Sequence, residues 1–230
     1  MIARTDLELA SSPAGNARHP WDWYVEEQWV THALCDVLPM EPDVTYLDPF
    51  AGRCHIPDAL ADRGLTAFGT DLFERGDSPR FLGTHDFLGD QIHMLEAMPG
   101  LSIVMNPPFS YQNGCLVRGL AEKCIRRALS IATHRVCALL PIKWLASAGR
   151  FRLFTEHMPS GIYVLSERPS MPPGDQIAAL GEAAYAHGKV DYVWIVWDRR
   201  SAPRDFAPTY WIAPREKPAR NARRGMPGRD

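Results

Sequence analysis

The chain has 230 residues, of which 46% are hydrophobic and 23% charged, a composition typical of one well-buried globular domain. No apolar run approaches the ~20 residues that a membrane-spanning helix needs, and residues 1–19 lack the basic-then-apolar order of a signal peptide. We therefore expect a cytoplasmic protein. The net charge of −2 conceals an uneven division: residues 1–100 carry 6 basic and 17 acidic side chains, and residues 101–230 carry 19 basic and 10 acidic. Either one face of the protein meets a polyanion, or the solvated surface is simply unevenly charged.

The ends of the chain differ in composition from its middle. Residues 1–20 are polar and contain a Ser-Ser-Pro-Ala-Gly run, which predicts a flexible arm. Residues 214–230 are rich in Lys, Arg and Pro and have almost no apolar content, which predicts a disordered basic tail. We expect residues 21–213 to form a single domain.

Between these ends, short apolar runs alternate with helical patterns, which predicts an α/β fold with a mostly parallel sheet of seven strands and helices on both faces. The link between the last two strands begins with a stretch rich in Pro and Gly, residues 168–174, and looks more like a hairpin or loop than a helical crossover. We therefore expect an antiparallel end strand. In chain order the predicted elements are a strand at 44–47, a helix at 55–63, a strand at 66–70, a weak strand ending near 85, a strand at 102–105, a helix within 116–133, and strands at 135–140, 162–165 and 192–197.

A polar side chain follows each of the first four predicted strands: Asp48, Asp71, Asp86 and Asn106. The carboxyl ends of parallel strands share one edge of a sheet, and ligands bind in the crevice outside it. A single Asp after a strand is commonly a turn or helix-capping residue. Four such residues after consecutive strands indicate a binding site.

The first of these turns, Asp48-Pro49-Phe50-Ala51-Gly52, has a single Gly. Dinucleotide and phosphate loops need more glycines or a Gly-Lys-Ser/Thr element, so neither phosphate cradling nor nicotinamide-dependent redox chemistry is favoured. A carboxylate leading the turn suits a cationic ligand such as the amino group of a methionine moiety. Asp71 is placed to accept ribose hydroxyls, and Asp86 with Phe87 to hold an adenine.

The motif Asn106-Pro107-Pro108-Phe109 is the most specific signal in the chain. Two prolines stiffen the loop and leave its carbonyls free to accept hydrogen bonds. An exocyclic amine held by Asn106 and a carbonyl could have its ring stacked on Phe109. A Pro-rich turn with Phe109 tucked into the core is the plainer interpretation, and the three Asp-ended strands before the motif favour the functional one.

With these motifs, the chain resembles class I S-adenosylmethionine-dependent methyltransferases that methylate amino nitrogens, and in particular the adenine-N6 DNA methyltransferases of phages and prophages. The resemblance covers about residues 21–198 and includes the segment Asp22–Glu26. The chain departs from the pattern at Glu27, where Pro is usual, and at Cys54, where a second Gly is usual; no insert is large enough for a separate target-recognition domain. The resemblance implies a Rossmann-like fold, S-adenosylmethionine as cofactor, and cofactor contacts from Trp23, Tyr24, Asp48, Pro49, Phe50, Ala51, Gly52, Asp71, Leu72, Asp86, Phe87 and Asn106.

The implied reaction is methylation of N6 of adenine in double-stranded DNA, with Asn106 to Phe109 as the catalytic motif. Proteins with this motif also methylate adenine in RNA or a glutamine amide in protein, and these acceptors stay open. So does a catalytically inactive nucleic-acid-binding module. Oligomeric state is not indicated by the sequence.

A few other residues carry predictions. Lys143, Arg150 and Arg152 are candidate phosphate contacts, with solvated surface charges as an equal alternative. Trp194 and Trp197 are predicted to lie in the core, and His55 to begin a helix rather than to catalyse. The five cysteines have no Cys-x-x-Cys spacing, so we expect free thiols and no metal site (Cys35, Cys54, Cys115, Cys124 and Cys137).

Overall fold

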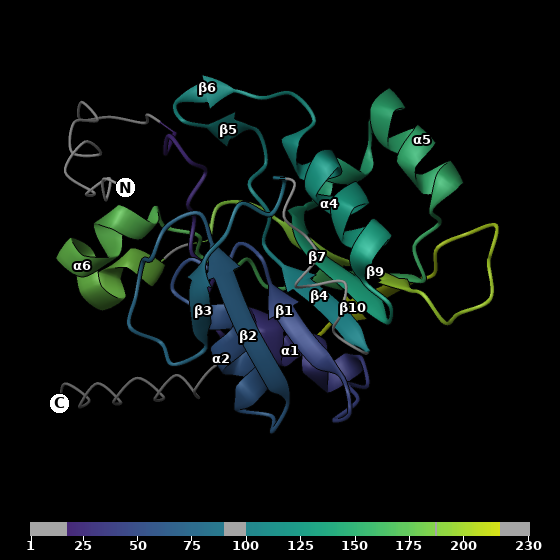
Figure 1. Ribbon diagram of the computed structural model, residues 1–230, viewed down its shortest axis with the longest axis horizontal. Helices are drawn as coiled ribbons and strands as arrows, with labels where there is room; N and C mark the ends of the chain where they lie inside the picture. Colours follow the sequence, from purple (N-terminus) through teal and green to yellow (C-terminus); the bar gives the residue numbers. More distant parts are fainter. Residues whose placement is uncertain (1–17, 90–99, 187, 217–230) are drawn as a thin grey trace, which may run out of the picture.

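An eight-stranded sheet with helices on both faces makes up most of the computed structural model, which describes residues 18–89, 100–186 and 188–216 (Figure 1). The order in space is β10-β8-β9-β7-β4-β1-β2-β3; β9 runs antiparallel to both neighbours, and the other pairs are parallel. The predicted mixed, mostly parallel α/β fold is confirmed. The strands are β1 (Thr45–Asp48), β2 (Thr66–Asp71), β3 (Phe81–Thr84), β4 (Leu101–Met105), β7 (Arg135–Pro141), β8 (Gly161–Leu165), β9 (Tyr192–Asp198) and β10 (Thr209–Ile212).

Two details of the predicted sheet are wrong. The sheet has an eighth strand, β10, of which only Ile212 is buried, so its sequence lacks the alternation that marks a strand. The antiparallel strand β9 is not at the end of the sheet but between β7 and β8, and its first six residues are all buried, as expected for a central strand. The predicted antiparallel pairing of the last two strands is confirmed in β8 and β9.

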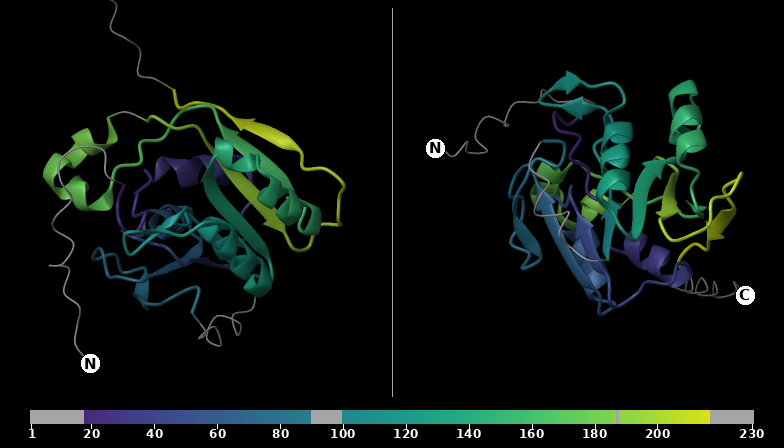
Figure 2. Two further views of the ribbon diagram at one scale, coloured as in Figure 1. Left: turned by 90° about the horizontal axis from the view of Figure 1, so that it is seen from above. Right: turned by 45° about the vertical axis from the view of Figure 1, so that its right-hand side comes forward.

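The helices divide between the two faces of the sheet, with α1 and α2 on one face and α4 and α5 on the other (Figures 1 and 2). Successive strand residues face opposite layers: Tyr46 packs with α1 and α2, and its neighbour Leu47 packs with α4. This alternation builds two hydrophobic cores. The helices are α1 (Trp29–Val37), α2 (His55–Ala61), α4 (Leu120–Ile131), α5 (Ala148–Glu156) and α6 (Ile177–Leu180), with 3₁₀ turns η2 (Ile142–Leu145), η3 (Gly174–Gln176) and η4 (Gly181–Tyr185).

The helix predicted within 116–133 begins at Leu120, because a hairpin takes the residues before it. Its strands are β5 (Tyr111–Gln112) and β6 (Cys115–Leu116), joined through Asn113 and Gly114, which have φ of 51° and 72°. Core positions for two tryptophans are confirmed, since Trp194 is 0% and Trp197 3% exposed. His55 is the first residue of α2, as predicted.

The predicted arm and tail fall mostly on residues 1–17 and 217–230, which lie outside the described residues. At the start of the predicted tail, Arg215 bonds Glu167 and lies 4.2 Å from the centre of the Trp29 ring. Within the described ranges, no helix is long and apolar enough to cross a membrane, and no cluster of three His, Cys, Asp or Glu side chains could hold a metal ion. All five cysteines are unpaired.

Candidate functional site

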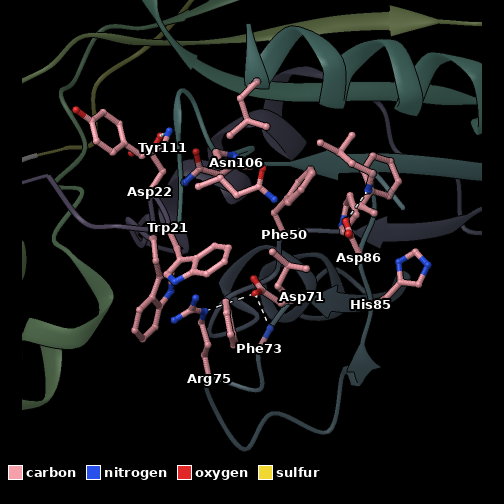
Figure 3. A pocket seen from close by; sticks show the side chains of 18 of the residues that line it. Trp21, Asp22, Phe50, Asp71, Phe73, Arg75, His85, Asp86, Asn106 and Tyr111 are labelled. Carbon is pink, nitrogen blue, oxygen red and sulfur yellow. Dashed lines mark hydrogen bonds and ion pairs between the residues drawn. The ribbon is translucent and has the colours of Figure 1, made fainter. Parts of the chain in front are cut away.

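A hollow, here called the strand-end hollow, lies beyond the carboxyl ends of β1, β2, β3 and β4 (Figure 3). It encloses about 660 Å³ including its open mouth, within the ~300–1,000 Å³ typical of small-molecule sites. The structure thus brings residues from four predicted strand ends to one place. Predicted site residues that line it are Trp23, Tyr24, Pro49, Phe50, Asp71, Leu72, Asp86, Phe87, Asn106 and Pro108.

The turn after β1 forms the floor behind this hollow. Asp48 is 2% exposed, and its Oδ1 accepts the N–H of Phe50 at 2.9 Å. Burial, followed by the negative charges of Glu26 and Asp71, raises the pKa of Asp48 well above its usual value. A carboxyl group held in this way is poised to meet a cation that would share its burial.

Asp71 gathers donors from three directions at the end of β2. Its Oδ2 accepts the N–H of Gly52 at 3.0 Å, and its Oδ1 accepts the N–H of Phe73 at 3.1 Å. The guanidinium of Arg75 lies 3.5 Å from the same carboxylate and stacks on the Trp23 ring at 4.1 Å (Figure 3). Asp71 is therefore fixed in direction, with an aromatic and cationic layer beside it.

Asp86 and Phe87 occupy the opposite side of the hollow (Figure 3). Asp86 is exposed, and its Oδ1 accepts the N–H of Leu88 at 3.0 Å. Phe87 is 1% exposed and meets Phe50 edge-to-face, with ring centres 5.3 Å apart. Together they offer an acceptor next to an apolar wall, which suits a flat heteroaromatic ring with an amino group.

The side chain of Asn106 is oriented by the N-terminal segment of the domain. Its Nδ2 donates to the Tyr24 carbonyl at 3.1 Å and to Glu26 Oε2 at 2.8 Å. Glu26 is 5% exposed, and burial raises its pKa, while the nearby His55 and the bond from Asn106 oppose that rise. With its N–H groups engaged, Asn106 keeps Oδ1 on the other arm of its amide as an acceptor.

Asp22 holds the backbone that follows the two prolines. Its Oδ2 accepts the N–H groups of Phe109, Ser110 and Tyr111 at 3.0, 2.7 and 2.8 Å. Arg18 forms an ion pair with the same carboxylate, whose side chain is 0% exposed. The motif loop is thus braced by residues that precede it by more than 80 positions.

Trp23 sits in a slot between two glycines. A Cβ on Gly174 would lie 2.1 Å from the Trp23 ring, and one on Gly52, whose φ is +50°, would lie 2.9 Å from its Nε1. Only glycine leaves room for the indole at these positions. The ring reaches the hollow from there, and the backbone next to it pairs with the later chain through a bridge between Tyr24 and Pro173.

A second, wider depression, here called the basic groove, lies on the other side of the motif loop. It encloses about 2,460 Å³ including its open mouth, more than a small-molecule site usually needs. Glu122 is the acidic side chain in its lining, and Phe109, Trp144 and Tyr192 supply aromatic surface. The cationic residues that line it are Arg18, Arg118, Lys143, Arg150 and Lys189.

The motif loop forms the wall between the two depressions. Asn106 and Pro108 line the strand-end hollow, Phe109 lines the basic groove, and Tyr24 lines both. Phe109 is half-buried and packs against both hydrophobic cores. A group bound in the hollow and a group bound in the groove would therefore meet at this loop.

No protein-family model matches the chain, and no curated protein matches it. Two solved structures resemble it. One is described as a class I S-adenosylmethionine-dependent methyltransferase from Listeria monocytogenes (TM-score 0.53, 14% identity, 80% of this chain and 63% of that one). The other is the methyltransferase subunit of a type I restriction-modification system from Streptococcus thermophilus (TM-score 0.53, 12% identity, 80% of this chain and 45% of that one). The fold is that of the class I methyltransferases.

At these identities the likeness establishes the methyltransferase fold, and the chain spans less than two thirds of either protein. The remaining predicted residues can be placed within that fold. Ala51 lies behind the hollow, where its N–H donates to the Thr70 carbonyl at 2.9 Å, and Pro107 is buried in the motif loop. Lys143 and Arg150 line the basic groove, whereas Arg152 lies in a separate depression beside Glu156.

Sequence reasoning missed several residues of the site: Trp21, Asp22, Glu26, Phe73, Arg75, His85, Tyr111 and Gln112. Asp22 and Glu26 belong to the segment that resembles known methyltransferases, and two acids in a stretch rich in aromatics were the available signal. Arg75 follows Asp71 by four positions, and that spacing in a loop gives no indication of a contact with Trp23.

Proposed function

We propose that the protein transfers a methyl group from S-adenosylmethionine to an exocyclic amino nitrogen, with N6 of adenine in double-stranded DNA as the acceptor. One observation carries the proposal: the Asn106–Phe109 loop separates the strand-end hollow from the basic groove. A methyl donor in the hollow and an amine reaching in from the groove would meet at this loop. The class I methyltransferase fold is consistent with the same reaction.

The residues of the hollow fit the parts of S-adenosylmethionine, which supplies an activated methyl group on a sulfonium when bound. Asp71 can accept ribose hydroxyls, and Asp86 can accept from an adenine amino group whose ring lies along Phe87. Trp23 Nε1 is a buried N–H for which the described residues provide no acceptor, and a carboxylate would satisfy it. The buried acids Asp48 and Glu26 suit the two positive charges of the same molecule.

The motif loop would hold the acceptor amine by geometry rather than by strong base chemistry. Asn106 Oδ1 and the Pro107 carbonyl accept the two amine protons, which favours a pyramidal nitrogen and so strengthens towards the transition state. Phe109 stacks on the attached ring. Glu26 and the Tyr24 carbonyl keep the Asn106 amide in the orientation that presents Oδ1. The proton is released after transfer, so no general base is assigned.

The basic groove supports a nucleic-acid acceptor. Five cationic side chains line it against one acid, and phosphates are bound by such residues. Lys143 and Arg150 are the proposed phosphate contacts among those that the sequence singled out. An adenine in duplex DNA has to leave the base stack first, at a cost of a few kcal/mol, and the aromatic floor around Phe109 would receive it.

The test supplies the protein with S-adenosylmethionine labelled in its methyl group, together with duplex DNA, RNA and a protein extract in parallel. We expect label in DNA, and N6-methyladenine after enzymatic digestion of that DNA. Label in RNA or in a glutamine amide would replace the proposed acceptor. Cofactor binding without any label in the three would indicate an inactive nucleic-acid-binding module.

A further inference from the structure

The motif loop has an unusual need for outside support. Pro107 and Pro108 carry no N–H, so the first backbone donors after Asn106 are those of Phe109, Ser110 and Tyr111. All three point at one oxygen, Asp22 Oδ2, over 2.7–3.0 Å. Hydrogen bonds to a charged acceptor are about twice as strong as neutral ones, and this carboxylate makes three of them out of contact with water.

The surroundings of Asp22 show that this contact is built in. Its backbone has a φ of 51°, a conformation that Asp and Asn tolerate and most other residues avoid. Arg18 neutralises the carboxylate through an ion pair, and its guanidinium also lies 5.2 Å from the centre of the Tyr111 ring. Arg18 itself lines the basic groove, so the support of the loop reaches the proposed target surface.

We propose that Asp22 is a positioning residue for methyl transfer: by fixing the three N–H groups after the prolines, it sets where the Pro107 carbonyl and the Phe109 ring stand relative to the strand-end hollow. This inference rests on the proposed function. Asp22 touches neither reactant in this role and acts through the loop. Glu26 orients the Asn106 amide from the same segment, so residues 22–26 brace both ends of the motif.

Backbone hydrogen exchange tests the brace without any assumption about the reaction. In Asp22→Asn, which keeps the size of the side chain and its tolerance of positive φ, we expect the peptide covering residues 109–111 to exchange at least about tenfold faster. Peptides from α2 and α4 should keep their protection. Asp43→Asn, at an exposed acid, is the matched control and should leave all peptides unchanged. Unchanged exchange at residues 109–111 in Asp22→Asn would overturn the proposal.

Steady-state methyl transfer then tests positioning. We expect Asp22→Asn to lower kcat by about tenfold or more, which corresponds to ~1.4 kcal/mol. Its affinity for S-adenosylhomocysteine, measured by calorimetry, should stay within about twofold of the parent protein. Combining Asp22→Asn with Phe109→Ala should cost less than the product of the two single losses, because both act through one loop. Fully multiplicative losses, or a fall in kcat matched by cofactor affinity, would indicate a merely structural role.

Two safeguards keep the outcomes separate. If Asp22→Asn does not fold, Arg18→Gln leaves the carboxylate in place and removes its counter-ion, and it should raise exchange at the same three amides. If that variant exchanges like the parent protein, the brace is refuted. If the parent protein methylates neither DNA, RNA nor protein, the proposed function fails, and the exchange experiment still decides whether Asp22 braces the loop.

Discussion

Asn106 and Phe109 lie on opposite sides of the wall between the strand-end hollow and the basic groove, and this separation gives them different proposed roles. Asn106 bonds the amine most strongly in the transition state, so Asn106→Ala should lower kcat by about 10²–10³-fold and leave cofactor affinity nearly intact. The measurement is steady-state methyl transfer with calorimetry of the cofactor. Substantial turnover by a folded Asn106→Ala would remove the catalytic assignment.

Phe109 is proposed to hold the acceptor ring in ground and transition states alike. Phe109→Ala should therefore weaken capture of the target, raising KM by an amount equivalent to about 1–3 kcal/mol. Phe109→Trp keeps a stacking face and is the matched control, which should retain most of the activity. A KM that is the same in Phe109→Ala and Phe109→Trp would contradict stacking.

Asp48 links the site to the pH dependence of stability. Its folded pKa is raised above the unfolded value by burial, so between those two pKa values the native state binds more protons than the unfolded state. Stability is therefore lost as pH rises through this window. Asp48→Asn removes the loss and should raise the free energy of unfolding by about 1–2 kcal/mol at neutral pH, with little change near pH 3, while weakening cofactor binding.

Chemical denaturation across pH 3–8 measures this effect. The exposed Asp43→Asn is the control and should follow the parent curve. Glu26 has a pKa raised in the same direction, so some decline with pH should persist in Asp48→Asn. A variant no more stable than the parent at neutral pH would show that the buried carboxylate costs nothing.

The residue scale also shows what the sequence could predict. Asp71, Asp86 and Asn106 were predicted together because each follows a strand, and strand ends meet by topology. The contacts of Asp22 and Glu26 with the motif loop span 80 to 89 positions. No local pattern encodes such distances, so these partners became apparent only when the chain was folded.

At the scale of elements, η3 fixes the place of Trp23. Gly174 opens η3 next to the indole, and its N–H donates to the Trp23 carbonyl at 3.0 Å. Gly174→Ala places a Cβ where the ring now stands, so Trp23 has to leave its slot. We expect affinity for S-adenosylhomocysteine to fall about tenfold or more, equivalent to ~1.4 kcal/mol.

Calorimetry with purified protein checks this expectation, with melting curves to show that the variant is folded. The control is Gly76→Ala, whose new Cβ would meet its nearest atom at 3.7 Å, an ordinary contact. If Gly174→Ala binds as tightly as the parent, the indole contributes nothing to the cofactor site.

The elements themselves were predictable to different degrees. Buried strands such as β4 and β7 are continuous apolar runs and were predicted to within one residue at each end. By contrast, β10 buries only Ile212, and the hairpin of β5 and β6 has two residues per strand, so neither carries enough periodicity to be seen. The place of β9 inside the sheet depends on pairing with β7 across more than 50 residues.

At the scale of the whole molecule, the uneven charge of the sequence becomes an uneven distribution in space. The strands β1, β2 and β3 come from the acidic first 100 residues and lie together at one end of the sheet, and the other strands come from the basic remainder. The boundary falls between β1 and β4. The motif loop follows β4 directly, so it stands where the acidic half, with its cofactor-type residues, meets the basic groove.

This arrangement leads to a prediction that separates the groove from other basic surface. Lys143 and Arg150 line the basic groove, whereas Arg152 lies in another depression with Glu122 and Glu156. Each phosphate neutralised by a bound cation contributes about 0.9 to the slope of log Kd against log salt. Replacing both Lys143 and Arg150 by Gln should lower that slope by about 2 and weaken binding of a fluorescent duplex of random sequence. Arg152→Gln, the matched control, should leave the slope unchanged. If Arg152→Gln lowers the slope and the double variant does not, phosphates bind outside the groove, and a salt-independent Kd in the parent protein would indicate that the acceptor is not a nucleic acid.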